Sequence, residues 1–80
     1  MSSRPDVPIP VVRRLSLYLR QLEAFDSAGV ATVSSRTLAR SLGLTDAQVR
    51  KDLTYFGPFG RPGIGYEVPG LIQRLRRVMG

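Results

Sequence analysis

The chain has 80 residues, which is enough for one small domain with a thin core, because such a domain buries only about 60% of its unfolded surface. Hydrophobic residues make up 42% and charged residues 22% of the chain, so we expect a packed core rather than general disorder. The absence of cysteine excludes disulfides and thiolate metal sites, and the absence of histidine removes the commonest general base and metal ligand. We therefore expect a binding module without catalytic residues or a metal site, and not an enzyme.

The charge is strongly basic, with 12 lysines and arginines against 6 acidic residues and a formal net charge of +6. All but one of these cations are arginine, which binds phosphates and guanine edges through paired hydrogen bonds. The surplus favours an anionic partner, and the alternative is a solvated basic surface. No apolar run approaches the ~20 residues of a membrane span, and the N-terminus has no signal-peptide core, so we expect a cytoplasmic protein.

The first part of the chain predicts a flexible N-terminal tail over residues 1–8, followed by one domain over residues 9–80. An amphipathic helix is expected over residues 10–27, and Gly29 is expected to end it in a left-handed conformation. Apolar residues recur every three or four positions along this helix and form its expected core stripe: Val12, Leu15, Leu19 and Leu22, with Tyr18 and Phe25 beside them.

The next segment, residues 30–33, is rich in β-branched residues and predicts a brief strand. Ser34 or Ser35 then caps a second helix over residues 36–42, and Gly43 ends it.

A third helix is predicted over residues 46–56, with Thr45 as its cap. Ala39, Gly43 and Val49 follow the spacing A-x3-G-x5-V, which is typical of a helix-turn-helix. The small Ala39 allows the two helices to approach, Gly43 adopts the positive φ of the turn, and Val49 packs into the core.

Residues 57–70 contain five of the eight glycines and three of the six prolines. They predict a two-stranded hairpin, or wing, over residues 57–68, with a tight tip at residues 60–63. A fourth helix follows over residues 69–79, with an apolar stripe of Leu71, Ile72, Leu75, Val78 and Met79. The predicted fold is mostly α with a small β-hairpin, which is the plan of a winged helix-turn-helix.

The third helix is the candidate recognition element. On a helical wheel Val49, Leu53 and Phe56 face the core, and Lys51 points away from them. The outward side also carries Ala47, Gln48, Thr54 and Tyr55, with Arg50 on its flank. Lysine can donate to guanine and glutamine can pair with adenine, so this face has the chemistry to read base edges. The alternative is an ordinary solvated face.

Two further contacts with DNA are expected. Arg61 lies at or next to the tip of the wing, where Gly63 permits close backbone approach, so it could enter an A·T-rich minor groove. Ser34, Ser35 and Arg36 could contact phosphates through hydroxyl and free N–H groups. A solvated loop arginine and simple helix capping are the respective alternatives.

The remaining arginines are less informative. Those of the first helix, Arg13, Arg14 and Arg20, are expected on a solvated face. Arg74, Arg76 and Arg77 fit either phosphate contacts or an interface. The six carboxylates are scattered, and no pair has the spacing of an active site.

Several segments resemble the bacterial Rex family of redox-sensing repressors. The matching stretches include AQVRKDL at residues 47–53, YFG at residues 55–57 and GIGY at residues 63–66, and the likeness extends from about Ile9 to Leu71. The resemblance implies a winged-helix domain that binds inverted-repeat operators in double-stranded DNA, A·T-rich with TTGTG-type half-sites. It assigns Arg50, Lys51 and Tyr55 to the recognition helix and residues 60–65 to the minor-groove wing.

The resemblance also implies a second, Rossmann-type domain that senses the NADH/NAD+ ratio, with NADH favouring release of DNA. Because 80 residues cannot hold that domain, we expect an excised DNA-binding domain or a natural short form, without a cofactor in this chain. A homodimer is expected for the full-length protein, and a monomer or weak dimer without NADH response for this chain. One departure concerns the wing, where Pro62 replaces the family's usual basic residue and the cation is Arg61. The competing hypothesis is a winged-helix interaction module that binds an acidic protein.

Overall fold

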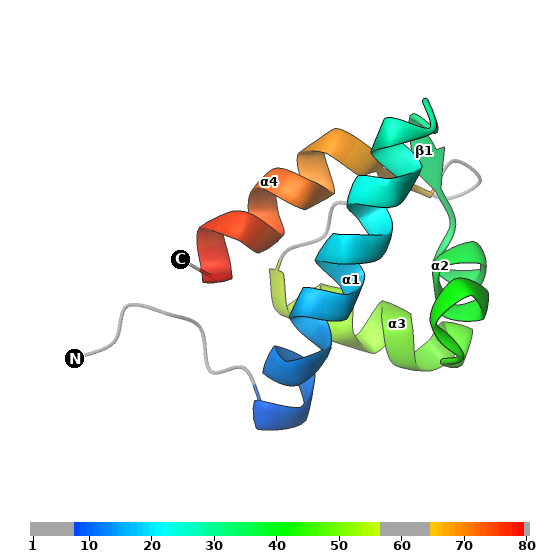
Figure 1. Cartoon of the computed structure of the whole chain (residues 1–80). Coiled ribbons are helices and arrows are strands. Elements are labelled where there is room, and N and C mark those ends of the chain that lie inside the picture. Colours follow the sequence, from blue (N-terminus) through cyan, green and yellow to red (C-terminus); the bar gives the residue numbers. More distant parts are fainter. Residues whose placement is uncertain (1–7, 57–64, 80) are drawn as a thin grey trace.

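The computed structural model describes residues 8–56 and 65–79, and Figure 1 shows how their helices are arranged. In chain order the elements are α1 (Ile9–Ser27), β1 (Thr32–Val33), α2 (Ser35–Leu42), α3 (Asp46–Leu53), the 3-10 turn η1 (Thr54–Phe56), β2 (Tyr66–Glu67) and α4 (Val68–Met79). This is the predicted mostly helical fold with one small sheet. Of the predicted tail, only Pro8 lies within the described residues.

The first helix, α1, starts and stops where local chemistry requires. Pro8 caps it and Pro10 lies in its first turn, where a missing N–H costs nothing. At the other end Gly29 has a φ of 83°, and its N–H donates to the carbonyl oxygen of Asp26. The N–H of Val30 donates to the carbonyl oxygen of Phe25, which completes a Schellman motif. The prediction of a left-handed glycine at this end is confirmed.

The buried stripe of α1 differs by one position from the prediction. Val11 is 4% exposed and belongs to the core, whereas Val12 is 49% exposed. Val11 lies four residues before Leu15, so it shares the face that Tyr18 and Leu22 also occupy. The prediction that Val12 packs inside was therefore wrong.

The helices α2 and α3 form the helix-turn-helix pair. Ser34 caps α2 by accepting a hydrogen bond from the N–H of Thr37, and Thr45 caps α3 by accepting one from the N–H of Gln48. These side-chain caps satisfy N–H groups that the first turn of a helix leaves free. The predicted capping of both helices is confirmed, with Ser34 rather than Ser35 at the first.

The turn between α2 and α3 has the predicted mechanics. Gly43 has a φ of 71°, a left-handed conformation that favours glycine. Ala39 and Val49 are 2% and 0% exposed, so the small residue and the core plug both lie inside. The third helix is shorter than predicted, because the chain tightens into η1 after Leu53.

The small sheet adds a strand pair that the predicted wing did not include. β2 pairs antiparallel with β1, with Thr32 opposite Glu67 and Val33 opposite Tyr66. The prediction paired the Tyr66 strand with an earlier strand of residues 57–70, but that partner and the tip fall on residues 57–64, outside the described part. Val68, predicted in the hairpin, is instead the first residue of α4 and is completely buried. Its N–H still donates to the carbonyl oxygen of Ala31, so the chain enters the helix directly from the sheet.

Gly65 directly precedes β2 and lies close to the backbone at the end of β1. Its φ is 93°, and a Cβ on Gly65 would lie 2.5 Å from the carbonyl oxygen of Val33. Only glycine both adopts this backbone conformation without strain and fits the space available.

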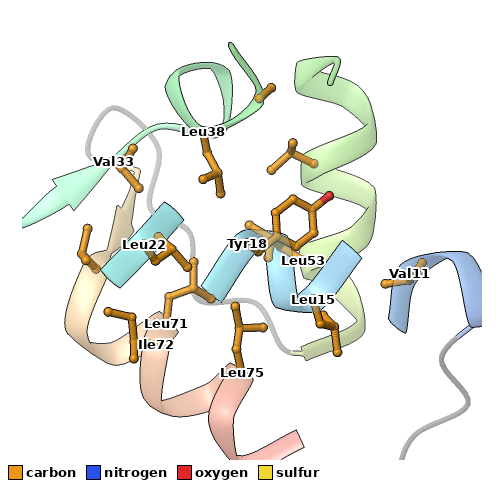
Figure 2. Packing of buried hydrophobic residues seen from close by; sticks show 13 residues of the cluster. Val11, Leu15, Tyr18, Leu22, Val33, Leu38, Leu53, Leu71, Ile72 and Leu75 are labelled. Carbon is orange, nitrogen blue, oxygen red and sulfur yellow. The ribbon is translucent and has the colours of Figure 1, made fainter. Parts of the chain in front are cut away.

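One core joins the helices, as Figure 2 shows. α1 packs against α4 and α2, and α2 packs against α3. Leu15 and Leu22 from α1 meet Leu71 and Leu75 from α4 in this core. Burial of each such side chain contributes about 1.5–3 kcal/mol, so the core fixes the orientation of α3 relative to α1. No helix in the described part of the chain is long and apolar enough to cross a membrane.

Candidate nucleic-acid interface

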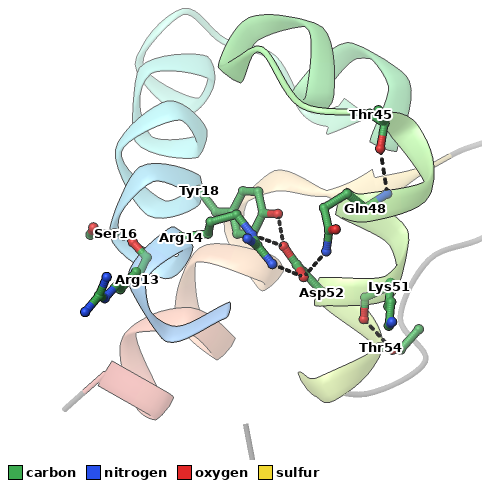
Figure 3. A network of polar contacts seen from close by, with 9 residues as sticks. All are labelled: Arg13, Arg14, Ser16, Tyr18, Thr45, Gln48, Lys51, Asp52 and Thr54. Carbon is green, nitrogen blue, oxygen red and sulfur yellow. Dashed lines mark hydrogen bonds and ion pairs between the residues drawn. The ribbon is translucent and has the colours of Figure 1, made fainter. Parts of the chain in front are cut away.

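The outer face of α3 has Lys51 near its centre. Lys51 is exposed, as are Ala47, Arg50 and Thr54, whereas Val49 and Leu53 are 0% and 1% exposed. In Figure 3 Lys51 lies on the side of α3 away from α1. The hydroxyl of Thr54 donates to the carbonyl oxygen of Lys51 at 2.6 Å, which closes the last turn of the helix. Two cations and one hydroxyl group are therefore exposed on α3 and the start of η1, and α3 is anchored on its opposite side.

Two residues placed on the outward side by the helical wheel lie elsewhere. Tyr55 is half-buried and packs against the core, since it follows the change from α3 into η1. Gln48 is also half-buried, and its amide donates to the carboxylate of Asp52. The prediction that their side chains share the solvated face with Lys51 was wrong, and both lie at its margin.

The first turn of α3 is tied to α2. Nε of Arg50 lies 3.6 Å from Oδ1 of Asp46, one turn earlier, and the hydroxyl of Ser35 donates to the same carboxylate oxygen. Arg50 remains 64% exposed, so it can exchange this weak surface pair for another anion. The hydroxyl proton of Ser35 is committed to Asp46, which leaves the hydroxyl oxygen only as an acceptor.

The start of α2 is a second exposed edge. Ser34 and Arg36 are exposed, and the hydroxyl of Ser34 also donates to Oγ1 of Thr37 at 3.0 Å. The capping role that was the alternative for Ser34 is confirmed, and the neighbouring Arg36 is exposed.

The predicted wing contacts, Arg61 and Gly63, lie outside the described residues. Tyr66, in the strand β2 at the end of the wing, lies within the described residues, and charged groups of α3 affect its pKa. Burial raises the pKa of Tyr66, the positive charge of Arg50 lowers it, and the negative charge of Asp46 raises it further, so that the balance is upward. The strand that ends the wing therefore lies within electrostatic reach of the first turns of α3.

The polar network behind α3, which joins α1 to α3 in Figure 3, is absent from the sequence-based predictions. Asp52 is completely buried, and its carboxylate accepts two hydrogen bonds from Arg14, from Nε at 2.6 Å and from Nη2 at 2.9 Å. The hydroxyl of Tyr18 and Nε2 of Gln48 also donate to it. Arg14, predicted on a solvated face, thus has its side chain only 23% exposed. A signal was present, because Asp52 follows Val49 by three residues and so borders the core face.

The pKa values of this network follow from its geometry. Burial alone would raise the pKa of Asp52, but hydrogen bonds from Arg14, Tyr18 and Gln48 outweigh burial and lower it. For Tyr18, burial and the hydrogen bond to Asp52 raise the pKa well above its ordinary value. At neutral pH the network therefore holds a carboxylate anion, a guanidinium cation and a neutral phenol.

The lowered pKa of Asp52 predicts a loss of stability in acid. An unfolded aspartate titrates near 3.9, so the contribution of Asp52 is complete above about pH 4 and declines as the pH falls through its lower, folded value. We expect the free energy of unfolding, measured with urea, to fall as the pH is lowered below about 4. Replacing the exposed Asp26 by asparagine should leave this decline in place, whereas a free energy that stays constant over the same range contradicts the prediction.

Together, the tight turn, the buried plug and the strand pair that leads into α4 define a helix-turn-helix domain of the winged type. The family described as "Putative DNA-binding protein N-terminus" matches residues 6–54. A redox-sensing transcriptional repressor Rex of Chloroflexus aurantiacus is 50% identical over 78 residues, which cover 96% of this chain and 37% of that relative. The Rex protein of Roseiflexus sp. is 48% identical over 80 residues, or all of this chain and 35% of the relative.

Solved structures agree with these relatives. The crystal structure of RSP in complex with beta-NAD+ and operator DNA has a TM-score of 0.88 and 42% identity, covering 92% of this chain and 34% of that chain. RSP in complex with beta-NADH has a TM-score of 0.81 and 37% identity, covering 94% of this chain and 33% of that chain. The chain belongs to the Rex family of redox-sensing transcriptional repressors and corresponds to its N-terminal DNA-binding part. It spans about a third of the length of these relatives.

Proposed function

We propose that this chain binds DNA sequence-specifically, as the N-terminal domain of a repressor that responds to NADH and NAD+. The observation that carries the proposal is the exposed face of α3, with Lys51 at its centre and Val49 and Leu53 buried behind it. The named relatives are repressors rather than enzymes, which supports a binding role. The first of the RSP structures contains operator DNA, which supports the same partner for this chain.

The proposed binding mode places α3 in the major groove. In a helix-turn-helix the residues of the recognition helix meet base edges while the preceding helix crosses the backbone. Lys51 would donate to guanine O6 and N7, and Gln48 would meet an adenine. Arg50 and Tyr55 would flank these contacts, and Ser34, Ser35 and Arg36 would bind phosphates at the start of α2. The wing of residues 57–67 would bring Arg61 and Gly63 to the minor groove.

For the longer protein we propose a homodimer on an inverted repeat, with its recognition helices one or more turns of DNA (~34 Å) apart. The nicotinamide cofactor would bind outside this chain, in the remaining two thirds of the relatives' length. The domain itself, residues 9–80, would bind a half-site as a monomer or weak dimer.

Replacing Lys51 by alanine is expected to weaken binding to a specific duplex by roughly 1–3 kcal/mol, the value of one good base contact. Stability should change little, because the side chain is exposed. Arg20→Ala is the matched control, since it also removes one exposed cation and lies on the side of α1 turned away from the core. Fluorescence anisotropy with labelled duplexes measures both, and equal affinities for wild type and the Lys51 variant would remove this base contact.

Selection of bound sequences from random duplexes tests the function itself. We expect an A·T-rich inverted repeat or its half-site, with an affinity that falls steeply as salt rises, because bound phosphates release counterions. Recovery of no preferred sequence, together with no duplex binding at low salt, would refute the proposal and favour an acidic protein as the partner.

A further inference from the structure

The amide of Gln48 is tethered in one orientation by the network behind α3. Its Nε2 donates to Oδ1 of Asp52 at 2.8 Å, one turn further along the helix (Figure 3). A carboxylate only accepts hydrogen bonds, so it is the nitrogen of the amide, and not the oxygen, that must face Asp52. The orientation of Gln48 is therefore set by chemistry as well as by packing.

In the hydrogen bond between Gln48 and Asp52, the carboxylate of Asp52 is held in place, whereas part of the Gln48 amide remains available. Asp52 is completely buried and is held from α1 by two hydrogen bonds from Arg14 and one from Tyr18. Gln48 is half-buried and lies in the first turn of α3, the part of a recognition helix that meets base edges. Its Oε1 accepts no hydrogen bond from any residue in the described part of the chain.

The tether limits what Gln48 can offer to a base. A free glutamine amide has two N–H donors and one acceptor, and one donor is committed to Asp52. One acceptor and one donor remain, which match the N6 donor and N7 acceptor of adenine. Guanine presents two acceptors, O6 and N7, so it needs two donors that the tethered amide does not have.

We propose that Asp52 is a positioning residue for base preference: by holding one N–H of Gln48 it restricts one position of the bound duplex to adenine over guanine. This inference rests on the proposed function, because it requires α3 to read the major groove. It assigns to the network of Arg14, Tyr18 and Asp52 a role in choosing the sequence, in addition to its role in joining α1 to α3.

The test compares adenine and guanine at the position that Gln48 reads. Duplexes recovered by selection are changed from A·T to G·C at each position in turn, and Gln48→Ala identifies the position where the preference depends on Gln48. For wild type we expect a preference for adenine of roughly 5-fold to 150-fold, the range of one paired contact. The variant Arg14→Met/Tyr18→Phe/Asp52→Leu removes the acceptor without leaving a buried charge or hydroxyl unpaired. It should reduce the preference to below about 3-fold.

The matched control is Ile72→Val, a mild change in the core under α4 that leaves the network intact. It should keep the preference of wild type, which separates positioning of Gln48 from general loosening of the domain. A triple variant that keeps the wild-type preference overturns the inference, as does a wild-type protein that binds specifically but without an adenine preference at any position. Absence of specific binding by wild type would instead refute the proposed function, and the inference with it.

A measurement on wild type alone covers the case in which the triple variant does not fold. The two Nε2 protons of Gln48 can be followed by NMR in the free protein. We expect the proton bonded to Asp52 to exchange with solvent more slowly than its geminal partner and more slowly than the side-chain amide protons of the exposed Gln73. Exchange of both Gln48 protons as fast as those of Gln73 would show a free amide and overturn the inference.

Discussion

Replacing Arg14 by alanine is expected to lower the free energy of unfolding by about 3 kcal/mol, the lower end of the range for breaking a buried ion pair. The reason lies in the partner left behind. Asp52 is completely buried, and without Arg14 its negative charge would keep only the hydrogen bonds from Tyr18 and Gln48. Desolvation of an uncompensated carboxylate then opposes folding.

Urea unfolding at neutral pH measures this loss. The control is Arg20→Ala, an exposed arginine of the same helix, which should change stability by less than about 0.5 kcal/mol. Comparable losses for the two variants would mean that the Arg14–Asp52 pair contributes no more than a surface charge. The pair's hydrogen bonds would then be of little consequence for stability.

Replacing Gly65 by alanine is expected to destabilise the domain by about 3 kcal/mol or more, because two penalties act at once. A left-handed conformation costs an alanine about 1–2 kcal/mol, and Gly65 has a φ of 93°. The new Cβ would also lie 2.5 Å from the carbonyl oxygen of Val33, so backbone would have to move. The movement would disturb the pairing of β1 with β2.

Gly43→Ala is the matched control for this prediction. Gly43 also has a positive φ, 71°, but a Cβ there meets nothing within 4 Å. Its cost should be only the conformational part, about 1–2 kcal/mol. Thermal or urea unfolding compares the two variants, and equal losses would show that the close approach of Gly65 to Val33 has no energetic effect. Because β2 ends the proposed wing, Gly65→Ala should also weaken duplex binding more than its control does.

The contacts behind these two predictions join residues that are far apart in the sequence, whereas the features that the sequence alone predicted depend on residues close together. The helix ends were predictable because they are local. Gly29 and Gly43 allow the left-handed conformation, and Ser34 and Thr45 accept hydrogen bonds within their own first turns. The exposure of Lys51 was predictable for the same reason, since Val49 and Leu53 fix the inner face of a regular helix.

The helical wheel failed where the helix or its neighbours depart from that regularity. Tyr55 turns toward the core because the chain tightens into η1 after Leu53. Val11 is buried instead of Val12 because it lies four residues before Leu15, on the face of α1 that Tyr18 and Leu22 also occupy. A pattern of apolar residues indicates that one face of a helix is buried. Where two apolar residues are adjacent, the pattern is uncertain by one position as to which of them lies at the centre of that face.

By itself the sequence determined a basic helical domain, its turns, and a recognition helix with an outward lysine, since each depends on residues a few positions apart. Only the tertiary structure decided that Arg14 binds Asp52 and that β2 pairs with β1. Arg14 and Asp52 are 38 residues apart in the sequence, and the paired residues Val33 and Tyr66 are 33 residues apart. When the core brings the helices together, a buried charge needs an opposite charge and a strand edge needs hydrogen-bond partners. These partners come from distant parts of the chain, so no local spacing in the sequence specifies them.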